Sequence, residues 1–148
     1  MEGAGGQGGP YAWDGIRFGP VDGEEGVRVG HLGRRLLHAY QASVAGAAGS
    51  GCNVLVDEVV IDRTTWREWA DALVGLDVVW VGIRCAAEVA EERNRRRGDG
   101  HRPGLAASLS VAVHRDAAYD FEIDTTTLAP VDALAALSRG LGIHPAQS

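Results

Sequence analysis

The sequence of 148 residues contains no lysine, so all 14 of its basic residues are arginines. Any mechanism that needs a lysine amine is therefore excluded for this chain. The arginines are outnumbered by 20 acidic residues, and the resulting net charge of −6 argues against a nucleic-acid-binding protein. With 45% hydrophobic and 23% charged residues, the composition is that of an ordinary globular domain.

Cysteine and long apolar runs are also scarce. The two cysteines, Cys52 and Cys85, lack metal-ligand spacing, and we interpret them as reduced thiols. No apolar run approaches the ~18–20 residues of a membrane-spanning helix, and no secretory signal is recognisable at the N-terminus. These features predict a cytoplasmic protein without a membrane partner.

Glycine is concentrated near the N-terminus, where residues 1–26 hold nine of the 21 glycines. Because glycine-rich backbone is entropically costly to order, we predict a glycine-rich, weakly ordered leader over this range. We predict that residues 27–148 form the C-terminal part of a single α/β domain.

Helical and strand-like patterns alternate after the leader. In chain order, we expect a helix that ends near residue 48, a strand at 52–60, a helix at 64–76, a strand at 77–85, helices at 86–97 and 105–115, a strand at 119–125 and a helix that begins at Pro130. The predicted buried faces of the first two helices consist of Leu32, Leu36, Tyr40 and Val44, and of Trp66, Trp69, Ala70 and Leu73. Thr65 and Glu68 have capping-box spacing. This alternation predicts an α/β domain in which helices flank a parallel sheet.

Polar residues follow the three predicted strands. Asp57-Glu58 ends the first, Arg84 ends the second, and Asp124, Thr125 and Thr126 end the third. Because parallel strands place their carboxyl ends at one edge, we expect a metal ion and an anionic ligand there. Alternatively, Asp57 only caps the following turn. His114 lacks a metal-spaced partner, and we interpret it as a structural histidine.

Six arginines lie between residues 84 and 102, and four of them fall within the predicted helix at 86–97. Glu91 with Arg95, and Glu92 with Arg96, have the favourable i,i+4 spacing, which predicts a salt-bridged face that contributes ~0.2–0.5 kcal/mol per pair. The remaining two, Arg93 and Arg97, are i,i+4 neighbours of like sign that face no carboxylate of this helix. Such a pair suits phosphate oxygens, the alternative being that both side chains point into water.

The succession "NVLVDEVV", "VGIRC", "EERNRRRGD" and "YDFEIDT" resembles the chloramphenicol phosphotransferase-like family of small P-loop kinases, over roughly residues 27–140. The resemblance implies a three-layer P-loop kinase-like fold. It also implies ATP and Mg²⁺ as cofactors, and transfer of the γ-phosphoryl group to a hydroxyl of a small molecule. Chloramphenicol is the acceptor that gives the family its name, so the resemblance also implies a role in antibiotic resistance.

Residue roles can be carried over from the resemblance. It implies nucleotide or phosphate binding by Arg93, Arg97, Arg102, Asp124 and Thr125. The arginines match the lid that closes over the phosphates, and Arg102 follows a one-residue insertion relative to the family's "GDR". Asp57 matches an acidic residue that contacts magnesium or water, and it is the candidate catalytic carboxylate.

The family's first strand and Walker A loop, G-x-x-x-x-G-K-[ST], have no counterpart in this sequence, nor does the family's catalytic aspartate. We therefore expect an N-terminally incomplete phosphotransferase that is inactive as this chain. A degenerate, non-catalytic module of the same fold that binds a nucleotide or a partner is the alternative. A third interpretation is an unrelated α/β protein with a solvated arginine helix. Without the first strand, the sheet has unpaired edges, and we expect marginal stability.

Overall fold

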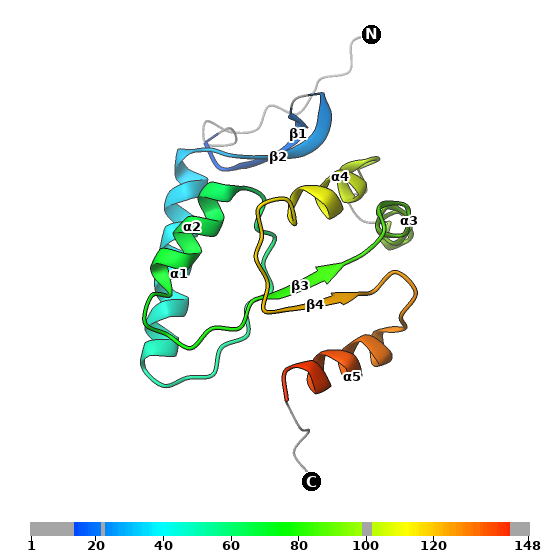
Figure 1. Ribbon diagram of the computed structural model, residues 1–148. Helices are drawn as coiled ribbons and strands as arrows, with labels where there is room; N and C mark the ends of the chain where they lie inside the picture. The colour runs from blue at the N-terminus through cyan, green and yellow to red at the C-terminus, as the bar shows by residue number, and fades with distance from the viewer. Residues whose placement is uncertain (1–13, 22, 99–101, 143–148) are drawn as a thin grey trace. The chain divides into compact units, whose positions relative to one another are not determined.

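The computed structural model describes residues 14–21, 23–98 and 102–142 (Figure 1). The chain divides into two compact units. The first unit consists of the chain up to Glu58 together with Arg67–Leu76, and the second of Val59–Trp66 together with the chain from Asp77 onward. Each unit is described by itself below. No helix in the described ranges has the length and apolarity needed to cross a membrane.

The first unit begins with an antiparallel hairpin of β1 (Ile16–Val21) and β2 (Glu24–Val29), in which Ile16 pairs with Val29. Helix α1 (His31–Gly49) follows, and the Asp14 carboxylate accepts a hydrogen bond from the His31 N–H at 3.1 Å. Residues 16–21 and 24–26 of the predicted leader thus have strand conformation. Residues 1–13 lie outside the described part of the chain.

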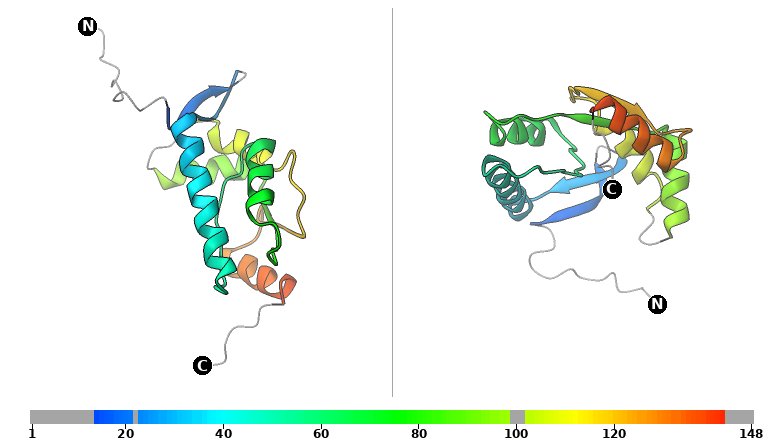
Figure 2. Two further views of the ribbon diagram at one scale, coloured as in Figure 1. Left: turned by 90° about the vertical axis from the view of Figure 1, so that its left-hand side faces the viewer. Right: turned by 90° about the horizontal axis from the view of Figure 1, so that it is seen from below.

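Helix α2 (Arg63–Ala72) lies beside α1, as both views of Figure 2 show. It begins one residue earlier than predicted because Asp62 caps it: one oxygen of the Asp62 carboxylate accepts the Thr65 N–H at 2.7 Å and the Thr65 hydroxyl at 2.9 Å. The prediction of Thr65 as the capping residue is wrong, since the Thr65 hydroxyl is a donor to the cap.

The buried faces of α1 and α2 match the prediction only in part. Val44 and Trp69 are buried as expected, with Trp69 only 2% exposed. Leu36, in contrast, is 62% exposed, and Gln41 occupies a buried position of α1 that the apolar pattern did not include. The buried face of α1 is thus rotated from the predicted one.

The predicted strand at 52–60 does not form. Residues 52–60 have no strand conformation, and Leu55 is 95% exposed. An apolar run becomes a strand only when a neighbouring strand satisfies its backbone N–H and C=O groups, and no strand in the described residues pairs with it.

The second unit contains the parallel pair that the sequence predicts. Strand β3 (Val81–Arg84) pairs with β4 (Phe121–Asp124), and the register places Arg84 opposite Asp124. Three helices belong to this unit: α3 (Ala87–Arg97), α4 (Leu105–Ala112) and α5 (Pro130–Gly140). Gly98, with φ +76°, ends α3, and Pro130 opens α5, as predicted.

The chain is therefore a mixed α/β protein with flanking helices, as expected. The described strands form two separate two-stranded sheets, one antiparallel and one parallel, instead of a single parallel sheet.

Candidate functional site

The carboxyl ends of β3 and β4 are joined by hydrogen bonds beyond the strands themselves. The Thr125 N–H and hydroxyl both donate to the Arg84 carbonyl, at 2.8 and 2.9 Å, and the Ala86 N–H donates to the Thr126 hydroxyl at 2.8 Å. This edge brings together Arg84, Asp124, Thr125 and Thr126, four of the residues that the sequence predicts to meet there. Asp57 and Glu58, also predicted for this edge, do not end a strand.

Two carboxylates at this edge have pKa values below those usual for their side chains. Hydrogen bonds from the Thr126 side chain, and from its N–H at 2.8 Å, lower the pKa of Asp124. A hydrogen bond and ion pair from Arg84 lower the pKa of Glu122. The edge therefore carries fixed charges of both signs at neutral pH.

Arg93 reaches from α3 to the end of β4. Its Nη2 donates to the Thr125 carbonyl at 2.7 Å, and its Nη1 lies 3.3 Å from the Thr125 hydroxyl and 3.4 Å from the Cys85 Sγ. The structure thus joins two predicted phosphate-binding residues, Arg93 and Thr125. None of the contacts of Arg93 within the described residues is with a carboxylate, so its positive charge is held at the strand end without being neutralised.

The other arginines of α3 separate into paired and unpaired side chains. Glu92 accepts from Arg96 Nε at 2.7 Å and from Arg95 Nε at 2.9 Å, and these bonds lower the pKa of Glu92. The predicted Glu92–Arg96 pair is confirmed. The predicted Glu91–Arg95 pair is wrong, because Arg95 uses Glu92.

Glu91 instead connects α3 to α4. Its Oε1 accepts the Gly104 N–H at 3.0 Å, at the N-terminus of α4. Arg97 and Arg102 are exposed. Arg97 makes no polar contact within residues 14–21, 23–98 and 102–142.

Asp57 is exposed and belongs to the first unit, whereas the arginines and Asp124 belong to the second. Within the described ranges, no three His, Cys, Asp or Glu side chains are grouped to hold a metal ion. Magnesium in kinase sites takes one or two carboxylates together with substrate phosphates, so the magnesium contact of Asp57 stays a prediction.

An aromatic cluster beside the β3–β4 pair escaped the sequence analysis. The His114 Nδ1 lies 2.7 Å from the Tyr119 hydroxyl, and the Trp66 ring contacts both Tyr119 and Trp80, with ring centroids 5.7 and 4.9 Å apart. Burial, and then the nearby Arg84 charge, lower the pKa of His114. A neutral, partly buried histidine on a tyrosine suits the predicted structural role.

Acidification through the histidine range is expected to destabilise the chain. The lowered pKa of His114 means that protonation favours the unfolded chain, so its stabilising contribution is lost as the pH falls below the unfolded value of about 6.5. Glu122 and Asp124, whose pKa values are also lowered, act in the same direction only below about pH 4.5.

The measurement is the urea midpoint of unfolding at pH 7.5 and at pH 5.5 for the native chain and for His114→Gln. The control is His38→Gln, which replaces an exposed histidine of α1. The His114→Gln variant should lose less stability over this interval than the other two proteins. An equal pH dependence in all three would contradict the assignment.

Comparison with known proteins places these features in a family. The profile of the chloramphenicol phosphotransferase-like proteins matches residues 12–140, so the chain belongs to this family. Two proteins from Mycobacterium tuberculosis, strains CDC 1551 / Oshkosh and ATCC 25618 / H37Rv, are each named "Putative O-phosphotransferase" and are 38% identical to it over 133 residues. The match covers 84% of this chain and 55% of each relative, so the chain spans about half their length.

Proposed function

We propose that this chain supplies the phosphate-clamping part of an ATP-dependent O-phosphotransferase, which transfers the γ-phosphoryl group to a hydroxyl of a small molecule. The observation that carries the proposal is the arginine pair of α3. Arg93 is anchored on Thr125 without a carboxylate partner, and Arg97 follows four residues later, exposed and without a polar contact in the described part of the chain. Forked guanidinium groups suit phosphate oxygens in number and geometry.

Each candidate residue has a role in this proposal. Arg93 and Arg97 bind the phosphates, with Arg102 as a third lid residue. Thr125 holds Arg93 in position, and Asp124 lies at the strand end that would face the nucleotide. Asp57 would contact Mg²⁺, which neutralises phosphate charge when bound.

These residues fit one side of a polyphosphate but not a complete kinase site. A phosphotransferase works mainly by electrostatic stabilisation of the transferring group, for which P-loop enzymes use backbone amides and a lysine. This sequence has no lysine. We therefore expect negligible phosphotransfer by these 148 residues alone, and propose that a Walker A element outside this sequence completes a three-layer P-loop kinase-like domain in the cytoplasm.

The absence of lysine also favours a second candidate function, a non-catalytic module of the same fold that binds a nucleotide or a partner. The DNA upstream of the Met1 codon discriminates between the two. A strand followed by G-x-x-x-x-G-K-[ST], encoded in frame, would assign the enzyme. An upstream sequence without it would assign the module.

Thermal unfolding of the purified chain with and without ATP and Mg²⁺ tests the binding step. Saturation at about 100-fold over Kd adds about 2.7 kcal/mol of stability, which shifts Tm visibly. We expect an upward shift with ATP that is smaller with AMP, because the arginines contact the phosphates. A Tm that ignores both nucleotides would contradict the proposal.

A further inference from the structure

Helices α1 and α2 line an open groove of about 510 Å³ within the first unit. This volume lies in the range of about 300–1,000 Å³ that is usual for small-molecule sites. The groove is lined by His38, Gln41, Ala42, Ala45, Glu68, Asp71 and Ala72. None of these residues belongs to the proposed phosphate-binding set.

Gln41 is the most unusual residue of the groove. It is only 2% exposed, yet its Nε2 has no hydrogen-bond partner in the part of the chain that the structure describes. Buried polar groups are nearly always hydrogen-bonded, because an unsatisfied donor keeps the full cost of its desolvation. An apolar side chain would pack at this position without that cost. The amide therefore points to an oxygen acceptor that enters the groove.

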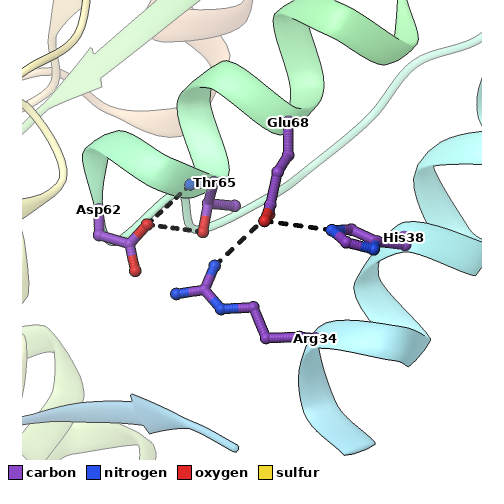
Figure 3. A network of polar contacts seen from close by, with 5 residues as sticks. All are labelled: Arg34, His38, Asp62, Thr65 and Glu68. Atoms are coloured by element: carbon purple, nitrogen blue, oxygen red, sulfur yellow. Dashed lines mark hydrogen bonds and ion pairs between the residues drawn. The ribbon is translucent and has the colours of Figure 1, made fainter. Parts of the chain in front are cut away.

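The groove is also acidic. Glu68 is held in place by two side chains of α1, with its Oε1 3.1 Å from His38 Nε2 and its Oε2 3.4 Å from Arg34 Nη1 (Figure 3). Asp71 lies three residues further along α2, on the same side of the helix, and its carboxylate meets no cation in the described residues. Because the Asp71 carboxylate has no such partner in the described residues, it favours an occupant with positive charge.

The apolar part of the lining consists of Ala42, Ala45 and Ala72. Alanine at three positions of a helix–helix contact leaves space that larger side chains would fill. The space, the unsatisfied donor and the unpaired carboxylate occur in the same groove.

We propose that the α1–α2 groove binds a small hydroxylated amine. Its ammonium group would bind Asp71 and Glu68, and one of its hydroxyl oxygens would accept a hydrogen bond from Gln41 Nε2. The proposal concerns binding alone and does not rest on phosphate transfer, so a chain that ignores ATP can still satisfy it.

Glucosamine is a suitable probe, and the side-chain amide of Gln41 is a suitable reporter. The chain has only three glutamines, Gln7, Gln41 and Gln147, so their NH₂ signals in a ¹⁵N spectrum are readily assigned with Gln41→Met. We expect glucosamine, added up to about 50 mM, to shift the Gln41 signals saturably with a millimolar Kd. Glucose, which lacks the ammonium group, should bind at least about tenfold more weakly because it cannot pair with the carboxylates.

Two variants locate the site, and a third controls for charge. Gln41→Met and Asp71→Asn should each weaken glucosamine binding about tenfold or more, followed through backbone amides of α1 and α2. Asp132→Asn, on α5 in the second unit, should leave binding unchanged. If Gln41→Met does not fold, Asp71→Asn alone carries the test. Unshifted Gln41 signals at the highest concentration, or equal binding by Asp71→Asn and Asp132→Asn, would overturn the proposal.

Discussion

Gly82→Ala is expected to destabilise the second unit by about 3 kcal/mol or more, because it forces atoms into a packed ring. A Cβ at this position would lie 2.5 Å from Tyr119 Cδ2, 2.6 Å from its Cε2 and 2.9 Å from its Cγ. Real Cβ atoms do not approach other atoms this closely, so either the ring or the strand must move.

Neither movement is easy. The Tyr119 ring packs edge-on against Trp66, and its hydroxyl lies 2.7 Å from the His114 ring nitrogen. Gly82 itself is in the middle of β3, opposite Glu122, so displacing its backbone would break the only strand pairing of this unit in the described residues. Relief of the clash therefore costs either aromatic packing or strand hydrogen bonds.

Urea unfolding followed by circular dichroism measures the effect. Gly46→Ala is the control, since a Cβ there meets no atom within 4 Å and alanine in a helix interior should stabilise α1 by about 0.5–1 kcal/mol. The Gly82→Ala substitution should cost less stability when it is made in a Tyr119→Ala background than in the native chain, because the ring that it clashes with is then absent. An unchanged midpoint for Gly82→Ala would show that the ring is not packed there.

Elements whose ends depend on local chemistry could be predicted from the sequence. Gly98 adopts φ +76° after α3, and Pro130 occupies the first turn of α5, so the signals and the structure coincide within a residue. The meeting of Arg84 and Asp124 at one edge was also predictable, because a strand–helix–strand order implies parallel strands whose carboxyl ends lie at the same edge.

Elements that depend on a partner could not be predicted in the same way. The apolar run at 52–60 is typical of a strand that is buried on both faces. Such a strand needs a neighbouring strand to pair with, and none pairs with it in the described residues, so Leu55 is 95% exposed. The β1–β2 hairpin was missed for a different reason. Its two-residue Asp-Gly connection and the alternation of Ile16 and Phe18 with polar or glycine residues are hairpin signals, which the glycine content of residues 1–26 obscured.

Polar residues in buried positions were the least predictable part of the molecule. Gln41 lies between Tyr40 and Ala42 of α1, and a search for apolar periodicity passes over it because its side chain is polar. The contact between His114 and Tyr119 joins the end of one helix to the segment before β4, and no motif spacing marks it. Both depend on how elements pack, which sequence periodicity does not specify.

Arg97→Ala is expected to weaken ATP binding by about 10–100-fold, the range that corresponds to a charge-assisted hydrogen bond of about 1.5–3 kcal/mol. Stability should change little, because Arg97 is exposed and has no polar contact in the described ranges. The only folded-state loss is a favourable charge in the last turn of α3, which contributes about 0.3–1 kcal/mol.

Arg96→Ala is the matched control. It removes the same charge one residue earlier on the same helix, but Arg96 is already paired with Glu92. Arg93→Ala is the third variant. It should lower both the ATP affinity and the stability, because Arg93 also donates a hydrogen bond to the Thr125 carbonyl. Isothermal calorimetry measures the ATP affinity of each variant, and the urea midpoint measures its stability. Calorimetry at two salt concentrations identifies the electrostatic part of the affinity, because the contribution of an exposed cation to phosphate binding weakens as salt rises.

The comparison of Arg96 and Arg97 distinguishes a phosphate clamp from a solvated face. On a solvated face the two positions are equivalent, and both variants would lose the same small affinity through net charge alone. In a clamp they differ, because Glu92 neutralises Arg95 and Arg96 and leaves the charge of Arg97 available to an anion. Equal affinities for Arg96→Ala and Arg97→Ala would therefore assign α3 to solvent and remove the observation on which the proposed phosphotransferase rests.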